Sequence, residues 1–234
     1  NEGIYVGYRY YEAKKQPVRW AFGHGLSYTD FEYSNLKLSS DSMNDNDEIL
    51  VEVDVRNTGN CEGKEVVQLY IADKNGTVNR PVKELKGFVK VSLLSGETKR
   101  VQMKINARDL SFYHEELEDW YAPSGRYELL IGHASDEVRL SCEITFTTKK
   151  MPPFHVTNAT TVGELLADSR TAAMTMQMLA PIQQQAAVSD SEEESDSQMM
   201  QALLDGLPLK SLSVLGVSGE MIDEMIRNLN QVCE

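Results

Sequence analysis

The sequence is poor in the features that mark several large classes of protein. Its 234 residues include only three cysteines, Cys61, Cys142 and Cys233, and no Cys-x-x-Cys pair, so neither a disulfide framework nor a zinc site is expected. No apolar run of about 18 residues occurs, which argues against a membrane-spanning helix. The net charge is -13, and the lack of a basic excess argues against binding to nucleic acid.

The motifs of common catalytic and cofactor sites are also missing. Gly23-His24-Gly25 lacks the third glycine and the preceding strand of a dinucleotide-binding loop, and no Gly-x-Ser-x-Gly elbow occurs. The many carboxylates mark no pair of the kind that a glycosidase sets across a sugar ring. No histidine has a partner at metal-ligand spacing, so turn or surface positions are expected for all four: His24, His114, His133 and His155. We therefore predict no catalytic, cofactor-binding or metal-binding residue.

Residues 1–30 are rich in tyrosine, glycine and arginine, yet they show no sustained helical or strand periodicity. Aromatic side chains at this density usually pack on another surface. A domain that stands by itself would give this lead-in little surface on which to pack. The glycines of Gly23-His24-Gly25 let the backbone turn sharply, because glycine reaches positive φ at little cost. The side chains predicted to pack on a neighbouring domain are Tyr5, Tyr8, Tyr10, Tyr11 and Trp20.

From residue 31 to about 150 the pattern is that of β-strands. In the segment EILVEVDVRNTG, Ile49, Val51 and Val53 alternate with charged residues, which predicts one buried and one wet face. Five further segments read as strands: EVVQLYIAD, KELKGFVKVSLL, RVQMKINA, RYELLIGHAS and EVRLSCEITFTT. With the strand that begins at Phe31, roughly seven strands at short spacing predict an immunoglobulin-like antiparallel β-sandwich.

Three stretches are predicted to lack strands or helices. Asp41 to Glu48 is acidic and polar, and it is interpreted as a loop or spacer. Asp109 to Tyr113 is interpreted as a short turn, and the nearby carboxylates as part of a solvated loop. A third acidic stretch, around 189–197, is interpreted as a linker within the C-terminal region.

After Met151-Pro152-Pro153 the spacing of the apolar residues changes from that of strands to that of helices. Residues 151–234 are therefore predicted to form a small helical appendix. Thr161 and Glu164 have the spacing of a capping box, which predicts the start of a helix. Met199 to Leu204 is expected to form a second helix, and Pro208 stands where another helix could begin. The last helix follows Ser218, with an apolar stripe that includes Met221, Ile222, Met225, Ile226 and Leu229.

Several separated motifs resemble glycoside hydrolase family 3, the β-glucosidases and β-xylosidases. They occur in the family's order over residues 1 to about 148: EGIYVGYRYY, FGHGLSYTDFEYSNL, NTGNCEGKEVVQLYI, RPVKELKGFVKVSLLSGETKRVQMKI and DLSFYHEELEDWYAPSGRYELLIGHASDEVRL. The tail segments TVGELLADSR and LPLKSLSVLGVSGEMIDEMI look like the helical extension of some bacterial members. The resemblance implies a fibronectin type III-like domain that follows a (β/α)8 barrel and an α/β domain, which carry the catalytic residues in such enzymes.

The resemblance implies that the chain is the accessory C-terminal part of a β-glycosidase acting on terminal β-linked glucose or xylose. A barrel takes about 250 residues, so the catalytic domains are expected upstream of Asn1, where the lead-in would pack on them. β-Glucoside or β-xyloside would be a substrate only of the full enzyme. The bacterial cytoplasm is the expected compartment. Two other functions remain as alternatives to that of a β-glycosidase part: a stand-alone module that binds carbohydrate or protein, and a structural adhesion domain.

Overall fold

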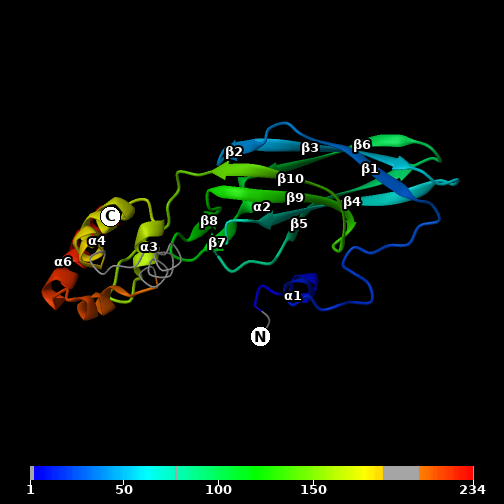
Figure 1. The fold of residues 1–234 in the computed structure, drawn as a ribbon. Helices are drawn as coiled ribbons and strands as arrows, with labels where there is room; N and C mark the ends of the chain where they lie inside the picture. Colours follow the sequence, from blue (N-terminus) through cyan, green and yellow to red (C-terminus); the bar gives the residue numbers. More distant parts are fainter. Residues whose placement is uncertain (1–2, 77, 187–205, 234) are drawn as a thin grey trace. The chain divides into compact units, whose positions relative to one another are not determined.

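The computed structural model describes residues 3–76, 78–186 and 206–233. The chain divides into two compact units, Asn1–Met151 and Pro152–Glu234, which we call the β-unit and the helical unit. Figure 1 shows the strands of the β-unit and the helices that follow them in sequence. None of the helices in the described ranges combines the length and the hydropathy that crossing a bilayer requires.

The β-unit contains two main sheets (Figure 1). The three-stranded sheet has the order β1-β3-β6, with β1 at Phe31–Leu38, β3 at Glu48–Asn57 and β6 at Thr98–Asn106. The five-stranded sheet has the order β2-β10-β9-β4-β5, with β2 at Ser42–Asn44, β10 at Glu137–Thr147, β9 at Gly125–Ala134, β4 at Gly63–Asp73 and β5 at Glu84–Leu93. Every pairing in these sheets is antiparallel except that of β2 with β10.

The two sheets bury their inner faces in one hydrophobic core. The alternation seen in the sequence sets these faces, because residues two apart on a strand point to the same side. Val51 pairs with Met103 and Val53 with Val101 across β3 and β6, and all four are buried. Leu69 of β4 lies opposite Ile131 of β9, and both are fully buried. The prediction of a mainly β fold with a small helical region at the C-terminal end is confirmed.

Two stretches that were predicted as loop and turn contain regular structure instead. The acidic stretch Asp41 to Glu48 includes the short strand β2, which forms because Met43 enters the core. The expected turn at Asp109 to Tyr113 is divided between a one-turn helix, α2 (Ala107–Leu110), and strand β7 (Phe112–His114). Asn106 and Asp109 form a capping box that starts α2, a signal that was not recognised in the sequence. Strand β8 (Asp119–Tyr121) pairs with β7 as a hairpin.

The lead-in contains one short helix, α1, at Tyr8–Ala13. Its six residues are too few for a helical period to be visible in the sequence, and none of them is buried. Gly7 precedes the helix at φ 63°, a conformation that favours glycine.

The helical unit contains α3 at Val162–Ala167, α4 at Ala172–Ala186, the 3-10 helix η1 at Leu209–Leu215 and α6 at Gly219–Cys233. The capping box of Thr161 and Glu164 starts α3 as predicted, and Pro208 lies at the start of η1. Val162, Leu165, Leu212 and Leu229 are buried in the unit's own core. The predicted helix at Met199 to Leu204 and the acidic linker around 189–197 lie outside the described residues.

Candidate functional site

Strand β4 is buried on both of its faces, which is unusual for an antiparallel sheet of this kind. Val67, Leu69 and Ile71 point into the core between the sheets. Gln68 and Tyr70 have the opposite phase and would face water on an uncovered sheet, yet they are 3% and 0% exposed. The lead-in covers this outer face.

Tyr8 is the main apolar contact between the lead-in and β4. Its ring stacks on Phe22 with 4.7 Å between ring centroids, and it meets Tyr70 edge to face at 6.0 Å. The Tyr8 hydroxyl accepts a hydrogen bond of 2.8 Å from the backbone N–H of Leu85 in β5. The Gln68 side chain donates to the backbone carbonyls of Gly23 and His133. These contacts give the buried polar atoms of β4 partners under the lead-in.

Ion pairs and a tyrosine hydroxyl attach the lead-in at the start of β5. Arg9 pairs with Glu84 at 2.9 Å, and Glu12 pairs with Lys83 at 2.6 Å. The Tyr5 hydroxyl hydrogen-bonds to the side chain of Asn79. The part of the lead-in from Tyr5 to Glu12 is therefore bonded to the start of β5 and the residues just before it.

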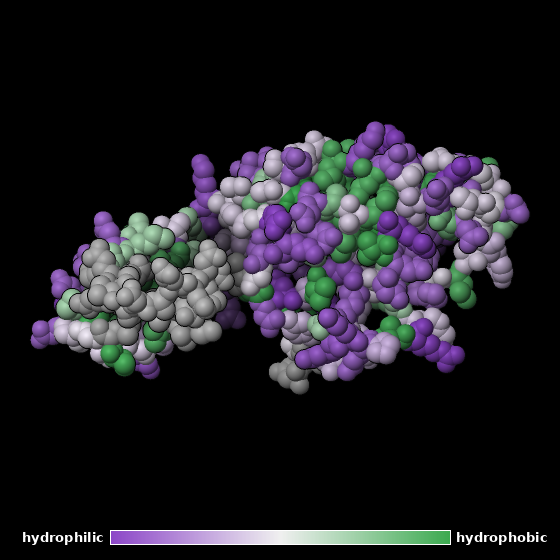
Figure 2. Space-filling view, in the orientation of Figure 1, coloured by the Kyte–Doolittle hydropathy of each residue, from purple (hydrophilic) through white to green (hydrophobic). Residues whose placement is uncertain are grey.

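The other side of the lead-in faces solvent. Of the five side chains predicted to pack on another domain, Tyr5 and Tyr8 are partly buried against the β-unit. Tyr10, Tyr11 and Trp20 are 36%, 44% and 64% exposed. Other large apolar side chains of this segment are exposed as well: Ile4, Val6, Val18, Phe22, Leu26 and Tyr28. On the face drawn in Figure 2 most of the surface is hydrophilic, and apolar side chains gather in a few places.

The lead-in joins the first strand through a firmly bonded turn. Gly23 has φ 83°, as expected for the residue that turns the chain. At the end of the segment, the buried hydroxyl of Thr29 donates to the Asn57 side chain at 2.5 Å. Asn57 is itself fully buried and donates to the carbonyls of Cys61 and Leu93. This network fixes where the lead-in joins strand β1.

A second polar network lies beside this turn, and the sequence analysis did not anticipate it. Glu65, 1% exposed, accepts hydrogen bonds from the Tyr33 hydroxyl at 2.6 Å and from Nδ1 of His133 at 2.5 Å. Nε2 of His133 lies 3.4 Å from the carbonyl of Gly25. His133 is therefore not a simple turn or surface histidine. It has a carboxylate partner 68 positions away in the sequence.

The pKa values of both groups that donate to Glu65, Tyr33 and His133, are raised. Burial of its ring lowers the pKa of His133, but the hydrogen bond and the charge of Glu65 outweigh it, so the pKa is raised overall. Burial, followed by the hydrogen bond to Glu65, raises the pKa of Tyr33. Protonated His133 thus supplies the charge that a buried carboxylate needs.

The remaining three predicted surface histidines differ in their surroundings. His24 and His155 are exposed, and His114 is half-buried in β7, where its ring lies 5.9 Å from that of Tyr121. In the described part of the chain, no group of three or more histidine, cysteine, aspartate or glutamate side chains is arranged to hold a metal ion.

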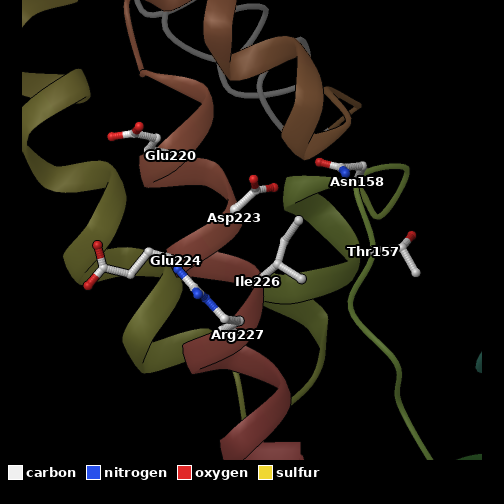
Figure 3. Close-up of a pocket in the computed structure, with 7 residues that line it drawn as sticks. All are labelled: Thr157, Asn158, Glu220, Asp223, Glu224, Ile226 and Arg227. Atoms are coloured by element: carbon white, nitrogen blue, oxygen red, sulfur yellow. The ribbon is translucent and has the colours of Figure 1, made fainter.

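The helical unit has a polar hollow along α6 (Figure 3). Glu220, Asp223, Glu224 and Arg227 project from successive turns of the helix, opposite a loop that carries Asn158. The other side of α6 contributes Ile222 and Leu229 to the core. This arrangement is the solvated face of an amphipathic helix.

Comparison with known proteins agrees with this geometry. Residues 65–135 match the family model described as a fibronectin type III-like domain. The chain is 39% identical over 236 residues to thermostable beta-glucosidase B of Acetivibrio thermocellus, covering 99% of this chain and 31% of that protein. It is 32% identical to an exo-alpha-(1->6)-L-arabinopyranosidase of Bifidobacterium breve, covering 96% and 29%.

A similar structure is that of a GH3 beta-glucosidase from Bifidobacterium adolescentis. It has a TM-score of 0.65 at 31% identity, and the match covers 74% of this chain and 25% of that one. The chain therefore corresponds to a C-terminal region of a glycoside hydrolase family 3 enzyme, the region that carries the fibronectin type III-like domain. It spans about a third of the length of the curated relatives that match nearly all of it.

Proposed function

We propose that the chain is the accessory portion of a β-glycosidase and that it braces the catalytic domains. The main support is the two-sided lead-in. One side is bonded to β4 and β5, and the other exposes Tyr11, Trp20 and Tyr28. Large aromatic side chains gain the most from burial in an interface, and a cluster of them on a surface marks a contact with another domain.

Hydrolysis belongs to the whole enzyme in this proposal, and the chain alone is inert. Terminal β-linked glucose or xylose is the proposed substrate class, and the sugar is selected outside this region. The related Bifidobacterium breve protein is named for a different glycoside although the match covers 96% of this chain. A region shared by such enzymes suits a structural role better than a role in sugar choice.

The test compares this chain with the longer protein encoded when the reading frame is extended upstream of Asn1. We expect turnover of nitrophenyl β-glucoside or β-xyloside by the longer protein and none by the chain alone. In the longer protein, Trp20→Ala should lower the thermal midpoint of the catalytic domains by a few degrees, because it removes buried contact area.

Phe88→Ala is the matched control, since Phe88 is an equally exposed ring on β5, at 66%, outside the lead-in. In the Phe88→Ala variant of the longer protein, the thermal midpoint of the catalytic domains should stay near that of the unaltered protein. Turnover by the repurified chain alone, or equal effects of the two substitutions, would contradict the proposal.

A further inference from the structure

A second surface of the β-unit combines aromatic walls with an excess of positive charge. It is a hollow of about 660 Å³, within the usual size range of small-molecule sites. The lead-in, the start of β5, α2 and the β7–β8 hairpin surround it. The cationic side chains that line it are Arg9, Arg80, Lys86 and Arg108, and its aromatic side chains are Phe112, Tyr113 and Trp120.

The carboxylates of this hollow do not balance its cations. Glu84 is shared by three of them, Arg9 at 2.9 Å, Arg80 at 3.0 Å and Lys86 at 3.4 Å. The other carboxylate that lines the hollow, Asp109, accepts the backbone N–H of Asn106 at the start of α2. A net positive hollow is notable in a chain of net charge -13.

Lys86 is the cation least compensated by Glu84. Its side chain is 17% exposed, and burial lowers its pKa despite the neighbouring carboxylate. Arg80 is better satisfied, because it also donates to the carbonyl of Leu110 at 2.7 Å and pairs with Asp73. An added anion would therefore be stabilised most by Lys86.

Arg108 is held in a geometry suited to binding a carboxylate. Its guanidinium lies over the ring of Trp120. The neighbouring carboxylate Asp119 pairs with Lys150, and the charge of Arg108 makes a smaller contribution to holding the pKa of Asp119 low. A guanidinium stacked on an aromatic ring keeps its N–H groups at the edge, where they can bind both oxygens of a carboxylate. The stacking also reduces the side-chain freedom lost on binding.

Tyr113 supplies an apolar platform next to these cations. Tyr113 is 51% exposed, and its ring meets that of Trp120 edge to face at 5.7 Å between ring centroids. Both rings belong to the β7–β8 hairpin, whose register places Tyr113 opposite Trp120. A flat ring beside fixed polar donors suits a ligand with an apolar face and a charged group, which describes a sugar acid.

We propose that this hollow binds an acidic saccharide, with its carboxylate at Arg108 and Lys86 and its ring against Tyr113. Ile4 and Arg9 of the lead-in also line this hollow, but Arg108, Lys86 and Tyr113, which would bind the ligand, lie outside the lead-in. Either proposal can therefore fail without the other. It would attach the enzyme to polymers that contain uronic acids, while hydrolysis takes place elsewhere.

The test is calorimetric titration of the 234-residue chain at low salt with a galacturonate trimer, and with cellotriose as the neutral probe. We expect the acidic trimer to bind, more weakly as salt is added, and cellotriose to bind at least about tenfold more weakly. Arg108→Ala and Lys86→Gln should each weaken binding of the acidic trimer by about tenfold. Arg108→Lys should also weaken it, because lysine cannot bind both oxygens in the same way.

Arg100→Ala is the matched control, since Arg100 pairs with Asp54 on the exposed face of β3 and β6 and should not affect binding. Circular dichroism of each variant checks that the fold is retained. The proposal is overturned if the trimer does not bind or if Arg100→Ala weakens binding as much as Arg108→Ala. Equal binding of a short polyglutamate would also overturn it and would indicate an acidic protein segment as the ligand.

Discussion

At the scale of single residues, the informative feature is a carboxylate on the apolar face of a strand. Glu65 lies on the same face of β4 as Val67, Leu69 and Ile71, which is the face that points into the core. His133 has the same phase on β9 as Leu129 and Ile131. A charged residue in the inward phase of two neighbouring strands was the signal in the sequence for a buried pair, and it was missed.

The Glu65–His133 pair predicts a pH-dependent stability. Because the pKa of His133 is raised in the folded state, the stabilisation is fully present below the ordinary histidine pKa of 6.5. It is lost as the pH rises through the raised value, since neutral His133 leaves Glu65 without a cation. The other ionisable groups that line the same hollow as the pair are Asp30, Tyr33, Glu137 and Arg139.

Urea unfolding of the β-unit within the full chain, from about pH 6 to pH 9, measures this effect. The free energy of unfolding should decline with pH in this range, and the decline should be smaller in Glu65→Gln, where the raised pKa is no longer held. The substitution should also cost about 1–3 kcal/mol below pH 6.5, the typical loss for a buried hydrogen-bonded charge. Parallel pH profiles for the two proteins would contradict the assignment.

At the scale of elements, the lead-in behaves as an added layer on the five-stranded sheet. It covers Gln68 and Tyr70 of β4, which explains how an antiparallel strand can be buried on both faces. Its attachment depends on a few side chains, and Tyr8 makes two ring contacts and one hydrogen bond to β5. None of the residues of α1 is fully buried, and Tyr8, its first residue, is partly buried.

Tyr8→Ala should therefore loosen the whole lead-in. We expect the protection of the Gln16 amide, which bonds to the carbonyl of Tyr11 at 2.8 Å, to fall by about tenfold in hydrogen exchange. Tyr10→Ala is the matched control, because the one ring near Tyr10 among the described aromatic contacts is Tyr11. Equal loss of protection in both variants would mean that Tyr8 does not anchor the segment.

At the scale of the whole molecule, the β-unit and the helical unit have separate hydrophobic cores. Leu129 is fully buried in the first, and Leu229 is fully buried in the second. Each core can therefore be weakened by itself, if the two units unfold independently.

Leu129→Ala should destabilise the β-unit by about 2–5 kcal/mol, the usual cost of a cavity in a well-packed core. Leu229→Ala should act in the same way on the helical unit. Amide exchange in β9 and in α6 measures the two effects within one full-length sample. If either substitution lowered protection equally in both units, the chain would be one cooperative unit.

Local patterns accounted for much of the fold and little of the site. The seven long strands, the capping box of Thr161 with Glu164 and the amphipathic α6 follow from periodicity and short-range spacing. The three-residue strands β2, β7 and β8 were not foreseen, because a period of two cannot be recognised over so few residues. Strand β2 forms where Met43 enters the core, whereas β7 and β8 pair with each other and contribute no side chain to that core.

The sequence by itself determined the faces of the strands, the helix starts and, through its motifs, the resemblance to family 3 enzymes. The tertiary structure alone decided which distant residues meet: Glu65 with His133, Tyr8 with Tyr70, and Lys86 and Arg108 around one hollow. The physical reason is that periodicity fixes the direction of a side chain along its own strand. Strand order and the path of the lead-in, which arise only when the core forms, fix its neighbours.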